Sequence, residues 1–203
     1  MSLHDRVVRK LVRTVKKEAM TRLDVVTPDM EPEFTTLFTD CHRYTMTSPE
    51  RMYALYKAVE YIVAARIPGD LVECGVWKGG SSMMMALALM HFGDTSRTLW
   101  LYDTFAGMPE PGELDLDWKG QDSVEKWETN QRDGHNEWCY SPPDEVKPNL
   151  ARTGYPADRI VYVQGKVEDT IPTQVPERTA ILRLDTDWYS STHHGLLKLG
   201  CSL

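Results

Sequence analysis

Acidic residues follow several short, mostly apolar runs of this sequence, at positions where a carboxylate can bind a ligand or move a proton. In ILRLDTDWYSST, Asp185 and Asp187 follow one such run, and alternation along an extended chain points both to the same side. Two close carboxylates raise each other's pKa unless a cation or hydrogen bonds stabilise their charges. A divalent metal would do so, or one carboxylate could accept the proton of a substrate hydroxyl. Two solvated acids in a turn are the alternative.

A glycine-containing turn, LVECGVWKGGSS at residues 71–82, follows an earlier apolar run. Gly75 lets the backbone approach a ligand, and the helix beginning near Ser81 offers free N–H groups. The spacing matches neither a P-loop nor the dinucleotide pattern GxGxxG. Glu73 beside the turn can hold an ammonium group, which favours a zwitterionic ligand. The alternative is a plain strand-to-helix turn with Glu73 exposed.

Two more strand ends carry candidate ligand contacts. Asp103, in LWLYDTFAGMPEP, can accept hydrogen bonds from both hydroxyls of a ribose, so with the glycine turn it favours an adenosine-containing ligand. Asp103 followed by Thr104 is also typical of a turn or helix cap. In VYVQGKVEDTIP a predicted strand ends at Gly165, and Val167 and Glu168 could meet an adenine edge. Acids of a first helical turn are the alternative there.

The elements that must position these residues alternate between strand and helix. A helix is predicted from Ser48 to the Pro68-Gly69 stop, and a buried helix from Ser81 to Met90. This alternation predicts an α/β fold, a mostly parallel sheet with helices on both faces. Residues 1–20 are predicted as a helix, 24–45 as a loop or lid, and 106–140 as irregular. The predicted strands are 71–74, 99–102, 160–163 and 180–184, with the third, second, first and fourth as neighbours in that order.

Composition narrows the class of protein. With 203 residues, 41% of them hydrophobic, the chain suits one domain or a little more, and its net charge of −7 disfavours nucleic-acid partners. No apolar run is long enough for a transmembrane helix, and no secretory signal is evident. Four dispersed cysteines without a CxxC motif fit a reducing cytoplasm. The basic N-terminal helix could lie on a membrane surface, but a solvated helix packed on protein is favoured.

Four motifs in register, VECGVWKGGSS, LYDTFAGMPEP, GKVEDTIP and LRLDTDWYSST, closely resemble the macrocin O-methyltransferase family over residues 33–192. The resemblance implies a Rossmann-like class I methyltransferase fold and S-adenosylmethionine as methyl donor. It also implies a small-molecule acceptor, a hydroxyl of a sugar or glycosylated natural product. TMTSPER, residues 45–51, resembles the family segment that closes over the cofactor, and this segment contains Met46.

The resemblance also implies roles for individual residues. Asp185 corresponds to a Mg²⁺ ligand beside the accepting hydroxyl, and Asp187 to the second acid of that pair, so both are predicted to be catalytic. Asp103 corresponds to the ribose acid. The other residues implied in cofactor binding are Glu73, Gly75 and Ser81 at the methionine end, Val167 and Glu168 on the adenine side, and Met46, Trp77 and Gly165 within the same motifs.

In one respect the sequence departs from the family. The family continues through further strands, and an Asp-Asp pair after the next strand completes its Mg²⁺ site, whereas this sequence ends with HHGLLKLGCSL. We therefore expect the last strands to be missing and the Mg²⁺ site to be incomplete. The tail does not resemble the family's helix, and Gly195 and Gly200 weaken a helix there. The predicted division is an N-terminal helix and lid (1–47) and a methyltransferase domain (48–203). The alternative function is a non-catalytic fragment that at most binds S-adenosylmethionine or a partner chain.

Smaller expectations concern the rest of the molecule. Trp188 and Tyr189 could stack on a flat or sugar-like substrate, and His135 is either a base or substrate contact or a solvated loop residue. The exposed strand edge and the N-terminal helix favour a homodimer.

Overall fold

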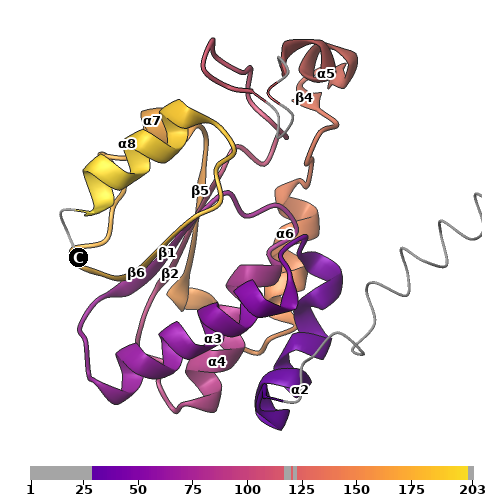
Figure 1. Cartoon of the computed structure of the whole chain (residues 1–203). Helices are drawn as coiled ribbons and strands as arrows, with labels where there is room; N and C mark the ends of the chain where they lie inside the picture. The colour runs from indigo at the N-terminus through magenta and orange to yellow at the C-terminus, as the bar shows by residue number, and fades with distance from the viewer. Residues whose placement is uncertain (1–28, 117–119, 121–122, 201–203) are drawn as a thin grey trace, which may run out of the picture.

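A four-stranded parallel sheet forms the centre of the protein (Figure 1). The computed structural model describes residues 29–116, 120 and 123–200. The strands are β1 (Asp70–Cys74), β2 (Leu99–Asp103), β5 (Ile160–Gln164) and β6 (Thr179–Leu184), and their order in the sheet is β5-β2-β1-β6. The predicted strands, their parallel direction and their order are all confirmed.

Parallel pairing brings the carboxyl ends of the strands to one edge of the sheet. In register, Cys74 of β1 pairs with Tyr102 of β2 on one side and with Leu184 of β6 on the other. Asp103 pairs with Gln164 of β5. Residues that directly follow these strands therefore meet at a single edge, as binding sites of open α/β sheets require.

Helices cover both faces of this sheet (Figure 1). Leu71 and Leu101 point into the larger core, while Val72 and Tyr102, their neighbours along the strands, point into the smaller one. Both faces are thus buried, which explains why these strands read as continuous apolar runs. Around the larger core lie α2 (Pro32–Cys41), α3 (Pro49–Ala64), α4 (Gly80–His91) and α6 (Pro143–Ala151), and around the smaller core lie α7 (Val167–Thr170) and α8 (Tyr189–Leu199).

Two predicted helices are confirmed close to their expected bounds. Ser48 is the N-cap residue of α3, Pro49 occupies its first position, and its buried face includes Met52 and Val59. α4 is buried on nearly all sides, with Met83 and Met84 at 1% and 0% exposure. Since the helix lies between the sheet and neighbouring helices, methionines can fill the irregular space on every side.

The prediction of a loop or lid over residues 24–45 is wrong for most of the part that the structure describes. Pro32 begins α2, and η2 (His42–Tyr44) follows it. Phe34 and Phe38, four residues apart, stack with ring centroids 5.5 Å apart, and both are buried in the larger core. Proline suits the first turn of a helix, so Pro32 marks the start of a helix rather than a loop. The helix predicted for residues 1–20 lies outside the described residues.

The tail forms a helix, α8, although Gly195 was expected to weaken it. α8 includes Gly195, and a β-carbon there would lie 2.9 Å from Cδ2 of Leu184. The glycine therefore lets α8 pack closely against β6, and this close contact offsets its low helix propensity.

The insert at residues 106–140 holds some regular structure. It contains the short helix α5 (Val124–Thr129) and a two-stranded antiparallel hairpin of β3 (Gln131–Arg132) and β4 (His135–Asn136). After α6, η3 (Ala157–Arg159) leads into β5. Within the described part of the chain, no helix has both the length and the apolar character needed to cross a membrane.

Candidate functional site

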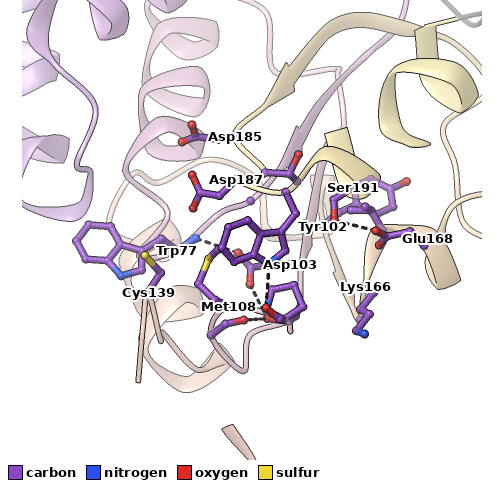
Figure 2. Close-up of a pocket in the computed structure, with 18 of the residues that line it drawn as sticks. Trp77, Tyr102, Asp103, Met108, Cys139, Lys166, Glu168, Asp185, Asp187 and Ser191 are labelled. Carbon is purple, nitrogen blue, oxygen red and sulfur yellow. Dashed lines mark hydrogen bonds between the residues drawn. The ribbon is translucent and has the colours of Figure 1, made fainter. Parts of the chain in front are cut away.

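A cavity of about 270 Å³ opens at the carboxyl edge of the sheet (Figure 2). Its walls come from residues 46–51, from the turn after β1 and from the ends of β2, β5 and β6. Glu73 and Ser81 do not line it. The predicted site residues that do line it are Met46, Gly75, Trp77, Asp103, Gly165, Val167, Glu168, Asp185 and Asp187.

Asp103 ties the glycine turn to the end of β2. Its Oδ2 accepts hydrogen bonds from the backbone N–H groups of Val76 (2.6 Å) and Trp77 (3.0 Å), and its Oδ1 accepts one from Phe105 N–H (2.8 Å). Three backbone donors therefore fix the carboxylate within the cavity wall. A carboxylate has about four acceptor positions. The Thr104 hydroxyl lies 3.4 Å from Oδ1 but is closer to the carbonyl of Gly107 (2.7 Å), so Asp103 can orient the turn and still meet one ligand hydroxyl.

Gly75 lets the ends of β1 and β6 approach each other. Its φ is +86°, and a β-carbon at this position would lie 2.3 Å from the carbonyl oxygen of Asp185. Next to it, the N–H of Asp185 donates to the carbonyl of Cys74 (2.8 Å). Only glycine allows both this backbone conformation and this approach, so the turn brings Asp185 to the cavity.

Glu73 lies behind the cavity rather than in its wall. Its side chain is 1% exposed, Oε1 contacts Nη1 of Arg183 (2.8 Å), and Oε2 accepts a hydrogen bond from the Ser82 hydroxyl. Burial raises the pKa of Glu73 to about 7, and the positive charge of Arg183 and the bond from Ser82 only partly oppose this. Ser81 is also buried, with its hydroxyl directed at Sδ of Met52 (3.7 Å).

Arg183 connects three parts of the site, and sequence reasoning missed it. Besides Glu73, it contacts Oδ2 of Asp185 (2.9 Å) and Oγ1 of Thr47 (3.0 Å), both through Nη2. Thr47 belongs to the segment expected to close over the cofactor. The sequence did contain a signal for this role. Arg183 is a cation inside an otherwise apolar strand, and a cation in such a position requires an anionic partner nearby.

Asp185 and Asp187 have different surroundings. Asp185 forms the ion pair with Arg183, whereas no described basic side chain lies within 4 Å of the Asp187 carboxylate. Partial loss of hydration, and then the negative charge of Asp185, raise the pKa of Asp187 above its ordinary value. Both carboxylates lie in the same part of the cavity, as Figure 2 shows.

The opposite end of the cavity is formed by α7 and α8 (Figure 2). Glu168 accepts a hydrogen bond from the hydroxyl of Ser191 (2.8 Å), and the neighbouring Val167 is 5% exposed. Glu168 is thus a first-turn acid of α7, which was the alternative reading, and it also lines the cavity. Glu168 can therefore stabilise the first turn of α7 and also contact a ligand in the cavity.

The structure places the three aromatic or histidine candidates in different surroundings. Trp188 lines the cavity but is 5% exposed, with its indole N–H donating to the carbonyl of Pro109 (2.8 Å). Tyr189 stacks on His193 (5.4 Å between ring centroids) and is not part of the lining. His135 stacks on Tyr140 and also lies outside the lining.

A parallel α/β sheet, a glycine turn after its first strand and an acid at the end of the second are features of Rossmann-like folds, the group that includes the class I methyltransferases. The family model described as "Macrocin-O-methyltransferase (TylF)" matches residues 4–201. The chain belongs to this family.

Individual relatives agree with this assignment. The chain is 36% identical over 172 residues to a tetracenomycin rhamnosyl 4'-O-methyltransferase of Streptomyces olivaceus, a match that covers 85% of this chain and 63% of that protein. It is 31% identical to demethyldecarbamoylnovobiocin O-methyltransferase of Streptomyces niveus, over 77% of this chain and 56% of that protein. The solved structure of the O-methyltransferase NovP superposes with a TM-score of 0.65 at 28% identity, covering 78% of this chain and 62% of that one. The chain therefore spans about three fifths of these relatives' length.

Proposed function

We propose that this protein binds S-adenosylmethionine in the cavity and transfers its methyl group to a hydroxyl of a sugar or glycosylated natural product. The observation that carries the proposal is Asp103, a carboxylate fixed in the cavity wall at the end of β2. Family membership supports the cofactor, and the names of the relatives support the class of acceptor.

Asp187 is the residue best suited to accept the hydroxyl proton. Its pKa is raised, so it is a better base toward neutral pH than an ordinary aspartate, and no ion pair holds it within the described residues. Asp185, held by Arg183, is suited to orient the hydroxyl. S-adenosylmethionine supplies a methyl group on a sulfonium, and holding the hydroxyl oxygen in line with that methyl contributes much of the rate.

A Mg²⁺ ion was expected at Asp185, and the described residues alone do not fit one. No group of three His, Cys, Asp or Glu side chains in the described ranges is placed to hold a metal. Asp185 and Asp187 provide two carboxylates, and Arg183 already pairs with one of them. Because Mg²⁺ requires near-octahedral oxygen ligands, Asp185 remains a proposed ligand that needs partners beyond these two, and the proposed reaction includes no step at a metal.

Calorimetric titration with S-adenosylhomocysteine tests the cofactor assignment. Asp103→Asn should weaken binding at least tenfold, because each lost hydrogen bond to a charged acceptor is worth about 1.5–3 kcal/mol. Asp70→Asn is the matched control: Asp70 lies at the amino end of β1 and accepts hydrogen bonds from Thr98 N–H and the Trp100 indole. It should change stability without changing affinity.

Equal affinity of the wild type and a folded Asp103→Asn variant would remove the basis of the proposal. Circular dichroism and thermal unfolding establish that the variant is folded. The proposed homodimer is tested on the same samples by light scattering. The homodimer is proposed because β6 has a neighbouring strand on only one side within the described sheet.

A further inference from the structure

A second hollow, of about 480 Å³, adjoins the cavity on the side of Trp77 and Cys139. The two share Met46, Trp77 and Cys139 in their linings. In Figure 2, Trp77 and Cys139 lie on the side of Asp187 away from Glu168 and Ser191. A ligand in this hollow would therefore approach the catalytic carboxylates from the end opposite the proposed adenine site.

Among the described residues, three aromatic rings line the hollow: Trp77, Trp138 and Tyr140. Trp138 packs edge-on against Trp188, with ring centroids 5.5 Å apart, and Tyr140 stacks on His135 at 4.2 Å. Such contacts restrict the rings before any ligand binds. Partly exposed aromatic faces that are already held in place bind flat, apolar groups at low entropic cost.

Lys126 gives the hollow a positive charge, which also acts on Asp187 and partly opposes the rise of its pKa. Its Nζ lies 3.5 Å from the ring centroid of Trp138, and no ion pair within 4 Å is formed in the described part of the chain. The other charged residues of the lining are paired. Lys78 contacts Glu145 (3.1 Å), and Glu137 lies near Arg132 (4.0 Å) and His135 (3.5 Å).

We propose that this hollow binds the aglycone of the acceptor and selects a planar aromatic aglycone that carries an anionic group next to Lys126. The inference rests on the proposed function, because it places the sugar hydroxyl at Asp187 in the adjoining cavity. A cation on an acidic protein attracts an anion locally, while the aromatic rings of the lining provide apolar contact surface. A saturated or neutral aglycone would use only part of these contacts.

Binding of three synthetic rhamnosides to the full chain tests the inference. The 4-carboxyphenyl and 4-carbamoylphenyl α-L-rhamnosides have the same shape and differ in charge, and cyclohexyl α-L-rhamnoside lacks the planar ring. With protein saturated by S-adenosylhomocysteine, we expect the carboxylate to bind about threefold tighter than the amide. We expect the amide to bind about fivefold tighter than the cyclohexyl compound.

Two variants separate charge from stacking. Lys126→Gln should abolish the preference for the carboxylate and keep the preference for the aromatic ring, and Trp138→Leu should reduce the latter. Lys147→Gln is the matched control, because Lys147 also lies over an aromatic ring, Tyr162 at 5.6 Å, but lines neither hollow. It should leave both ratios unchanged.

Equal affinities for all three rhamnosides, no binding of any of them, or a carboxylate preference that survives Lys126→Gln would each overturn the inference. These outcomes are distinct from failure of the proposed function, which would appear as lack of S-adenosylhomocysteine binding. In that case the same three titrations on the unloaded protein still decide whether the hollow selects an anionic aromatic group.

Discussion

Replacing Gly75 with alanine tests how the ends of β1 and β6 form the site. The φ of +86° is left-handed, which costs a residue with a β-carbon about 1–2 kcal/mol. The new methyl group would also lie 2.3 Å from the carbonyl oxygen of Asp185 and 2.8 Å from its carbon. Displacing that backbone adds about 1–3 kcal/mol, as for other overpacking substitutions. We therefore expect Gly75→Ala to lower the free energy of unfolding by about 2–5 kcal/mol.

Gly93→Ala isolates the conformational part of this cost. Gly93 has a φ of +78°, and a β-carbon there meets nothing within 4 Å. Urea unfolding should show a loss of only about 1–2 kcal/mol for this control. S-adenosylhomocysteine affinity should fall for Gly75→Ala alone, since only that methyl displaces the cavity wall. If the two variants lost equal stability and kept equal affinity, the close approach of the two strand ends would not support the site as described.

Two further predictions concern the buried pair behind the cavity. The pKa of Glu73 is raised from 4.5 to about 7, so the folded protein binds this proton more tightly than the unfolded chain does. Protonation of Glu73 therefore stabilises the folded state by up to about 3 kcal/mol. This stabilisation is complete below pH 4.5 and is lost as the pH rises through 7. Unfolding of Glu73→Gln measured from pH 4.5 to 8 should lack this decline relative to wild type, and parallel curves would contradict the assignment. Arg183→Gln should cost up to about 3–5 kcal/mol near pH 8, because Glu73 then lacks its cation and must either stay charged in a buried site or take up a proton. The double variant should recover much of that loss in urea unfolding, and strict additivity would show that the pair is not coupled.

The sheet was predictable because its strands are mostly apolar. Leu71, Val72, Leu99 and Leu101 of the two central strands are fully buried, and each strand is a largely apolar run bounded by turn residues. Because the strands are parallel, their carboxyl ends place Asp103 and Asp185 at the same edge of the sheet. Residue types and their positions in the sequence were sufficient to predict the sheet and these two site residues.

Contacts between distant segments were not predictable in this way. Residues 24–45 were taken for a loop because Pro28 and Pro32 outweighed Phe34 and Phe38. Phe34 packs against Tyr53 and Tyr56 of α3, which are distant in the sequence. Glu73 follows an apolar run just as Asp103 does, yet it is enclosed by Arg183 and Ser82 while Asp103 faces the cavity. Alternation along β1 does not say which neighbour a side chain meets, and that depends on the register with β6.

The arrangement around Arg183 gives the two neighbouring aspartates different chemistry. One guanidinium contacts Glu73, Asp185 and Thr47, so Asp185 is held by a charged partner and joined to the segment at residues 45–51. Asp187 has no such partner among the described residues, and its pKa is raised by lost hydration and by Asp185. Neighbouring carboxylates that lie in different surroundings commonly divide their roles. This supports Asp185 as the residue that orients the acceptor and Asp187 as the one that takes its proton.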